Sequence, residues 1–166
     1  TVVQPAQLIA SVLQTTNVLC FGGTATVFVS TTGGTPSVTG IGNFTVAAGW
    51  NSYTVMDNYG CQDTTSIFIS QPTLLVANAT QTSAVLCNGG NAVINVSASG
   101  GTPGYIGQSN FTVIAGTYTY TVSDTNGCTA NTSITISQPN PLQAIATVTS
   151  PIVCNAGTGV ITITGA

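Results

Sequence analysis

Residues 110–128 read Asn-Phe-Thr-Val-Ile-Ala-Gly-Thr-Tyr-Thr-Tyr-Thr-Val-Ser-Asp-Thr-Asn-Gly-Cys, and this stretch decides the fold. Residues 43–61 carry a second version of it, Asn-Phe-Thr-Val-Ala-Ala-Gly-Trp-Asn-Ser-Tyr-Thr-Val-Met-Asp-Asn-Tyr-Gly-Cys, displaced by 67 residues without a gap. Residues 20–86 align with residues 87–153 at 36 identities in 67 positions, which indicates duplication. The 166 residues are therefore predicted to form a tandem array of short units, and not one large domain.

Each unit has the alternation and punctuation of β-strands. Apolar residues alternate with polar ones, and Gly-rich or Pro-containing turns follow every 8–12 residues, as in an immunoglobulin-like β-sandwich of about seven strands. The strands predicted for the second unit begin near Leu75 and continue at 92–98, 105–108, 111–114, 118–122 and 132–137. Residues 100–104 are predicted to be a loop, and 124–127 a hairpin turn in which Asn-Gly supplies positive φ.

The unit boundaries are predicted to follow the Gln-Pro pairs at 4–5, 71–72 and 138–139. Residues 1–5 would end a preceding repeat, 6–72 and 73–139 would be repeat units 1 and 2, and 140–166 would begin a truncated third. Proline ends strands and stiffens short linkers, so these immunoglobulin-like units are expected to stack end to end as a rod.

The charge content is extremely low. The chain has no Lys, Arg or His, and its three acidic residues are Asp57, Asp63 and Asp124, giving a net charge of −3. Nucleic acids and anionic membrane surfaces are bound through cations, so neither is an expected partner. No apolar run approaches the roughly 18 residues of a membrane span, so membrane insertion is not expected. Thirty threonines, with Ser, Asn and Gly, would hydrate the surface instead.

The five cysteines, at 20, 61, 87, 128 and 154, are spaced by 41, 26, 41 and 26 residues and so follow the repeat. Without His or a Cys-x-x-Cys pair, zinc is the weaker interpretation. The pattern favours disulfides, and therefore an oxidising, extracellular location.

Four segments of the second unit form a recurrent pattern: Cys-Asn-Gly-Gly at 87–90, Gly-Gly-Thr-Pro at 100–103, the run from Ala115 to Cys128, and Ser-Ile-Thr-Ile-Ser-Gln-Pro at 133–139. In this pattern the chain resembles the SprB repeat family of very large cell-surface adhesins from gliding Bacteroidota. The first unit departs from it at Phe21 and at Trp50-Asn51. The resemblance implies filaments on the bacterial cell surface, exported by the type IX system and making adhesive contacts.

Strand order leaves the cysteine pairing open between two schemes. The second and sixth strands of such a sandwich run in the same direction, so the two cysteines of one unit would lie at opposite ends, too far apart for a disulfide. End-to-end stacking would instead pair Cys20 with Cys128 across a junction, leaving Cys61, Cys87 and Cys154 with partners outside these residues. The alternative is pairing within units, Cys20 with Cys61 and Cys87 with Cys128.

No catalytic constellation is visible. Ser and Cys lack a His or Lys base, and Asp57 and Asp124 would lie in different units, so no enzyme activity is expected and no catalytic, cofactor-binding or metal-binding residue is assigned. Asp57 and Asp63 flank one turn and could approach as a weak Ca²⁺ site. Asp63 is replaced by Ala130 in unit 2, which favours a turn-capping role for Asp57 and Asp124.

Two surface residues are candidates for contact or modification. Trp50, on the turn entering a strand of unit 1, could stack on a sugar or a neighbouring filament, or simply pack on its own loop. Thr64, in Asp63-Thr64-Thr65, resembles a Bacteroidota O-glycosylation motif.

The leading functional hypothesis is an adhesive or structural stalk segment of a very large extracellular adhesin or filament, with disulfides joining its repeats. Its partners would be neighbouring repeats, like filaments or surface polysaccharide, and no cofactor is expected. The alternatives are a carbohydrate- or partner-binding β-sandwich module and a polymer formed by strand donation.

Overall fold

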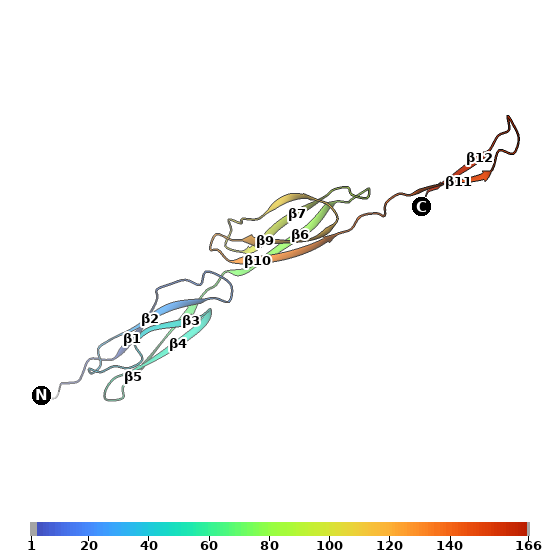
Figure 1. The fold of residues 1–166 in the computed structure, drawn as a ribbon. Coiled ribbons are helices and arrows are strands. Elements are labelled where there is room, and N and C mark those ends of the chain that lie inside the picture. Colours follow the sequence, from blue (N-terminus) through green and yellow to red (C-terminus); the bar gives the residue numbers. More distant parts are fainter. Residues whose placement is uncertain (1–2, 166) are drawn as a thin grey trace. The chain divides into compact units, whose positions relative to one another are not determined.

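The computed structural model describes residues 3–165, and these residues form an all-β structure with no helix (Figure 1). Several small antiparallel sheets build it. No helix in this described part of the chain is long and apolar enough to span a membrane. All-β architecture was the prediction from the alternating sequence, and it is confirmed.

Residues 9–69 contain two sheets. Their strands are β1 (Ile9–Gln14), β2 (Thr24–Thr32), β3 (Gly42–Ala47), β4 (Gly49–Met56) and β5 (Gln62–Ile69). The first three form one antiparallel sheet in the order β1-β2-β3, and β4 pairs with β5 in the other. The two sheets share their core, because Val27 and Val29 of β2 are buried in the same clusters as Val55 of β4 and Ile69 of β5.

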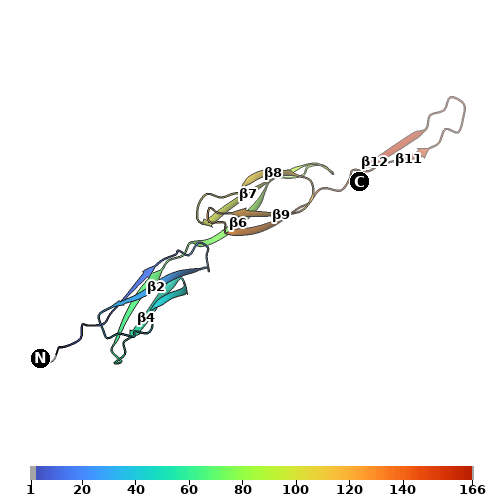
Figure 2. The ribbon, with the colours of Figure 1, turned by 60° about the vertical axis from the view of Figure 1, so that its left-hand side comes forward.

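Residues 73–136 repeat this strand order, and Figures 1 and 2 together label their five strands. The strands are β6 (Thr73–Ser83), β7 (Ala92–Gly101), β8 (Ser109–Val113), β9 (Gly116–Ser123) and β10 (Thr129–Ile136). The sheets are β6-β7-β8 and β9-β10. The predicted strand at 92–98 lies within β7, and its alternate residues Ala92, Ile94 and Val96 are all buried.

The last two strands form a hairpin. β11 (Ala144–Ser150) pairs antiparallel with β12 (Val160–Gly165), and the register shifts between Val148 and Ser150. Every residue of both strands is exposed, including Ile145 and Ile163.

The prediction of about seven strands per unit was wrong, because five form. The expected strand at 105–108 is reduced to a single bridge between Ile106 and Ser123. Positive φ angles at Gly104 and Gly107 on either side prevent a regular ladder there. The Gly-rich loop also begins later than expected, because β7 continues through Gly101.

The described chain divides into two compact units. Of the described residues, the first comprises 3–78, 97–108 and 121–131, and the second comprises 79–96, 109–120 and 132–165. The sequence repeats at 6–72 and 73–139 therefore do not coincide with these units.

The core shared by the two sheets of residues 9–69 contains an unsatisfied polar group, the hydroxyl of Tyr53. The Tyr53 ring packs against Phe44, with centroids 5.1 Å apart, but its hydroxyl is buried with no hydrogen-bond partner, and burial raises the pKa of the phenol. Tyr53→Phe should therefore stabilise the protein by on the order of 1 kcal/mol, because it removes an unsatisfied polar group while keeping the ring. Denaturant unfolding measures this. Tyr120 lies at the equivalent position of the second repeat, but its hydroxyl is not a buried group without a partner. Tyr120→Phe is therefore the matched control and should change the free energy of unfolding little. A loss of stability in Tyr53→Phe alone would contradict the interpretation.

Candidate functional site

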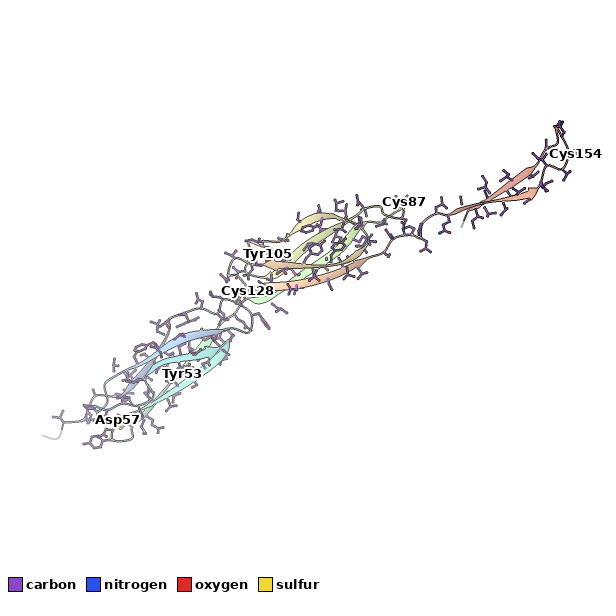
Figure 3. The ribbon with its side chains drawn as sticks, in the orientation of Figure 1. Tyr53, Asp57, Cys87, Tyr105, Cys128 and Cys154 are labelled. Atoms are coloured by element: carbon purple, nitrogen blue, oxygen red, sulfur yellow. A yellow bond between two sulfur atoms is a disulfide. The ribbon has the colours of Figure 1, made fainter. Side chains whose placement is uncertain are left out.

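The turn between β9 and β10 is organised by the side chain of Asp124. The Gly127 N–H donates to the Asp124 carbonyl, and the Asp124 N–H donates to the Cys128 carbonyl, both at 3.0 Å. The carboxylate atom Oδ1 accepts the N–H groups of Asn126 and Cys128, both at 2.9 Å. Only 3% of Asp124 is exposed. The carboxylate therefore fixes the backbone of Cys128, which is labelled in Figure 3.

The other oxygen of Asp124 binds a second loop. Oδ2 accepts the N–H of Thr102 at 2.9 Å, in the Gly-Gly-Thr-Pro loop at the end of β7. This loop approaches closely: a Cβ on Gly101 would lie 2.6 Å from Oδ2, and one on Gly100 would overlap the Leu74 carbonyl oxygen. Both glycines also have positive φ, so the repeated Gly-Gly is required by space and by conformation.

Asp57 makes the same three hydrogen bonds 67 residues earlier. Its Oδ1 accepts the N–H groups of Tyr59 at 3.0 Å and Cys61 at 2.9 Å, and its Oδ2 accepts the Thr35 N–H at 3.0 Å. The expected turn-capping role of both aspartates is thus present, with an added bond to the preceding loop. One detail of the turn was predicted wrongly: Gly127 alone has positive φ, whereas Asn126 does not.

These hydrogen bonds hold both carboxyl groups in the charged form. The Thr102 N–H is the main reason that the pKa of Asp124 lies below its usual value, and the Thr35 N–H has the same effect on the pKa of Asp57. Burial acts in the opposite direction on both groups and is outweighed. A carboxylate that accepts several N–H bonds is stabilised without any cation, which suits a chain that has none.

A disulfide joins Cys20 to Cys128, with Cα atoms 5.7 Å apart. Both cysteines lie in the first compact unit, although they belong to successive sequence repeats. This is the pair proposed from strand direction. The alternative pairs within repeats do not form: Cys61 and Cys87 are free and exposed. Cys154, in the turn between β11 and β12, is also free and exposed in this structure.

The intrarepeat pairing fails because the two cysteines of the first repeat lie at opposite ends of its strands. The residues that follow β2 and β4 meet where Thr35 donates to Asp57, next to Cys61. Cys20 precedes β2, and the adjacent Gly22 N–H donates to Gln71 Oε1, beyond the end of β5, at 2.8 Å. The physical reasoning about direction holds even though the strand count was wrong.

Asn126 completes the surroundings of the disulfide. Its Nδ2 donates to the Leu19 carbonyl at 3.1 Å and to Thr102 Oγ1 at 2.9 Å. Phe21, Leu74 and Leu75 line the cavity of about 320 Å³ beside the two sulfur atoms. The loop of Cys20 is therefore held by a covalent bond and by a hydrogen bond.

Asp63 does not join Asp57 in a cation site. Its Oδ2 accepts the Ala10 N–H at 2.7 Å, and both oxygens of Asp57 are occupied by backbone N–H groups. In residues 3–165 no group of three or more His, Cys, Asp or Glu side chains could hold a metal ion. Asp57 and Asp63 therefore do not offer the pair of free carboxylates that a weak Ca²⁺ site would need.

Trp50 is 75% exposed and packs edge-on against Phe68 of the paired strand, with ring centroids 5.5 Å apart. The equivalent residues of the second repeat, Thr117 and Thr135, are joined through their hydroxyls at 3.0 Å. Thr64 is exposed on β5, with its hydroxyl 3.0 Å from that of Thr54. Its glycosylation stays a prediction.

Sequence reasoning missed the residues that hold the cysteine loops. Gln71 Oε1 accepts the Gly22 N–H, and Gln138 Oε1 accepts the Gly89 N–H at 2.9 Å. The signal was the repeated Ser-Gln-Pro, which was interpreted only as a boundary. Asn126 had no such signal, because Tyr59 replaces it in the first repeat.

A scan against protein-family models and a search of curated proteins found no match to this chain.

The lowered pKa values predict an acid-sensitive fold. A carboxyl group whose folded pKa lies below its unfolded value of 3.8 contributes stability above that value, and this contribution is lost as the pH falls through the folded pKa. With no His or Glu to titrate, the free energy of unfolding should be flat between about pH 5 and 7 and should fall below about pH 4. Urea titrations across this range test it, and a decline that begins near pH 6 would contradict it.

Asp124→Asn should destabilise the protein much more than Asp63→Asn. Both Asp124 oxygens accept N–H groups, so an amide in its place must turn its NH₂ toward a donor. Asp63 accepts only the Ala10 N–H, and an amide at that position can keep this one bond through its oxygen. Thermal unfolding should show a loss of several degrees for Asp124→Asn and little change for Asp63→Asn. Equal effects of the two substitutions would show that charge, rather than the number of accepted bonds, is what matters.

Proposed function

We propose that the chain is a segment of an extracellular stalk, built of tandem immunoglobulin-like β-sandwich repeats in which each repeat is disulfide-bonded to the next. The observation that carries the proposal is the bond between Cys20 and Cys128, which belong to successive repeats of the sequence. Such a bond would carry tension past the Gln-Pro boundary at 71–72. A disulfide is compatible with an oxidising extracellular location.

Composition supports the same role. A surface without Lys or Arg offers no cleavage site to trypsin-like proteases and no cation for nonspecific binding to anionic polymers. The three carboxylates bind backbone N–H groups, so they serve the fold. The resemblance to SprB repeats adds the bacterial cell surface and adhesion to the proposal.

A second candidate function is carbohydrate binding by the first repeat. The exposed Trp50–Phe68 pair favours it, because exposed aromatic faces can stack on apolar faces of sugar rings. The second repeat lacks this pair, because Thr117 and Thr135 occupy the equivalent positions. We therefore place any such contact at one repeat of the stalk and not along its whole length.

The stalk proposal predicts a mechanical signature. When one chain is stretched from its ends, the residues between Cys20 and Cys128, which are 108 apart, should stay untensioned until a reductant is added. Reduction should then release roughly 350–390 Å of extended chain. Cys20→Ser, the control, should release this length without a reductant. If the oxidised wild-type protein already extends by this length, the Cys20–Cys128 disulfide does not carry the tension and the proposal is wrong.

A further inference from the structure

A cavity of about 440 Å³ lies beside the free Cys61, at the place in the first repeat where the second repeat holds the loop of Cys20. Its walls include Leu8, Thr35, Asp57, Tyr59 and Asp63. Leu8 and Cys61 correspond to Leu75 and Cys128, which line the space beside the disulfide. The same receptor is thus seen twice in one chain, once with a cysteine loop bound and once open.

The Cys61 turn has the same backbone geometry as the Cys128 turn. The Asp57 N–H donates to the Cys61 carbonyl at 3.0 Å, and the Asp124 N–H donates to the Cys128 carbonyl at the same distance. In both turns the cysteine N–H lies 2.9 Å from the aspartate Oδ1. Cys61 is therefore already positioned as Cys128 is when it is bonded.

The loop of Cys87 matches the loop that fills the occupied receptor. The Gly90 N–H donates to the Cys87 carbonyl at 2.9 Å, as the Gly23 N–H does to the Cys20 carbonyl. The Gly89 φ is 76° and the Gly22 φ is 75°, and Gln138 binds Gly89 as Gln71 binds Gly22. Leu86, which corresponds to Leu19, is 84% exposed. Cys87 is exposed and free.

We propose that the Cys61 cavity is a docking and disulfide-forming site for the loop 86–89 of a second copy of this chain. The assignment rests on the proposed function, because it extends the Cys20–Cys128 staple from successive repeats to successive molecules. The contact joins two different surfaces, so copies add head to tail, into a closed ring or an open polymer according to the rotation between them.

The covalent step is a thiol–disulfide exchange with a small disulfide such as oxidised glutathione. The Cys61 thiolate attacks one sulfur of oxidised glutathione, forming a mixed disulfide and releasing one glutathione thiolate. The Cys87 thiolate of the second copy then attacks the Cys61 sulfur and releases the second glutathione. Two protein thiols and one oxidised glutathione give one protein disulfide and two reduced glutathiones.

One side chain distinguishes the open receptor from the occupied one. Asn126 donates to the Leu19 carbonyl, whereas Tyr59 at the equivalent position is 80% exposed and has no amide to offer. Tyr59→Asn should therefore supply this hydrogen bond to the Leu86 carbonyl. The yield of the cross-link should rise several-fold, since a net hydrogen bond of about 1 kcal/mol corresponds to roughly a fivefold change in equilibrium.

The test is incubation of an equal mixture of ¹⁴N- and ¹⁵N-labelled chains in a glutathione redox buffer. Non-reducing gels should show a ladder, and pepsin digests should contain Cys61–Cys87 linked peptides, with one isotope on each side of the bond. Cys61→Ser should abolish the ladder, Cys154→Ser should leave it, and Tyr59→Asn should strengthen it.

Several results would overturn the proposal: a ladder that persists in Cys61→Ser, linkage through Cys154, or linked peptides of one isotope only. The Cys20–Cys128 peptide in the same digest separates the two claims. If the Cys20–Cys128 peptide is present while the Cys61–Cys87 peptide is absent, this inference is wrong but the proposed stalk function is not contradicted. If Cys20–Cys128 is itself missing, the staple of the proposed function fails.

Discussion

Three backbone N–H groups converge on one carboxylate, and the rest of the repeat depends on that convergence. Asp124 takes one N–H from the Gly-Gly-Thr-Pro loop and two from its own turn, and Asp57 does the same. Each carboxylate therefore joins the loop that follows the middle strand of one sheet to the turn of the other sheet. A buried charge normally needs a cation, but three directed N–H dipoles meet the same electrostatic need within the repeat.

The same interaction explains where the cysteines can act. In Asp-x-x-Gly-Cys the cysteine N–H is one of the three donors, so the sulfur-bearing residue sits at a fixed place at the end of the strands. Cys128 can bond to Cys20 once the loop that contains Leu19 lies beside this turn. The hydrogen bond from Asn126 to the Leu19 carbonyl helps to hold the loop there. A preorganised cysteine loses little conformational freedom when it bonds, and the disulfide then restrains the chain on both sides.

Sequence reasoning succeeded where a residue's role is set by a period of two or by chain direction. The alternation in 118–122 predicted a strand, which β9 contains, and the direction of the strands favoured Cys20 with Cys128 over pairing within a repeat. It failed where glycine geometry decides the outcome. The sequence of residues 104–107 did not show that Gly104 and Gly107 would take positive φ angles and so reduce the expected strand to a single bridge. The contact of Asn126 with the Leu19 carbonyl depends on three-dimensional proximity, and the sequence held no signal for it because Tyr59 replaces Asn126 in the first repeat.

The near absence of charge follows from how this chain is held together. Surface ion pairs contribute little to stability, and a protein without them gives up little if apolar burial and disulfides take their place. Val27, Val29, Val55 and Ile69 are completely buried in the first repeat, and each such side chain contributes about 1.5–3 kcal/mol. Threonine rows such as Thr117–Thr135 and Thr54–Thr64 cover the outer faces with paired hydroxyls. Stability here thus comes from apolar burial, N–H bonds to carboxylates and sulfur, none of which requires a cation, so a surface free of Lys and Arg is compatible with a stable fold.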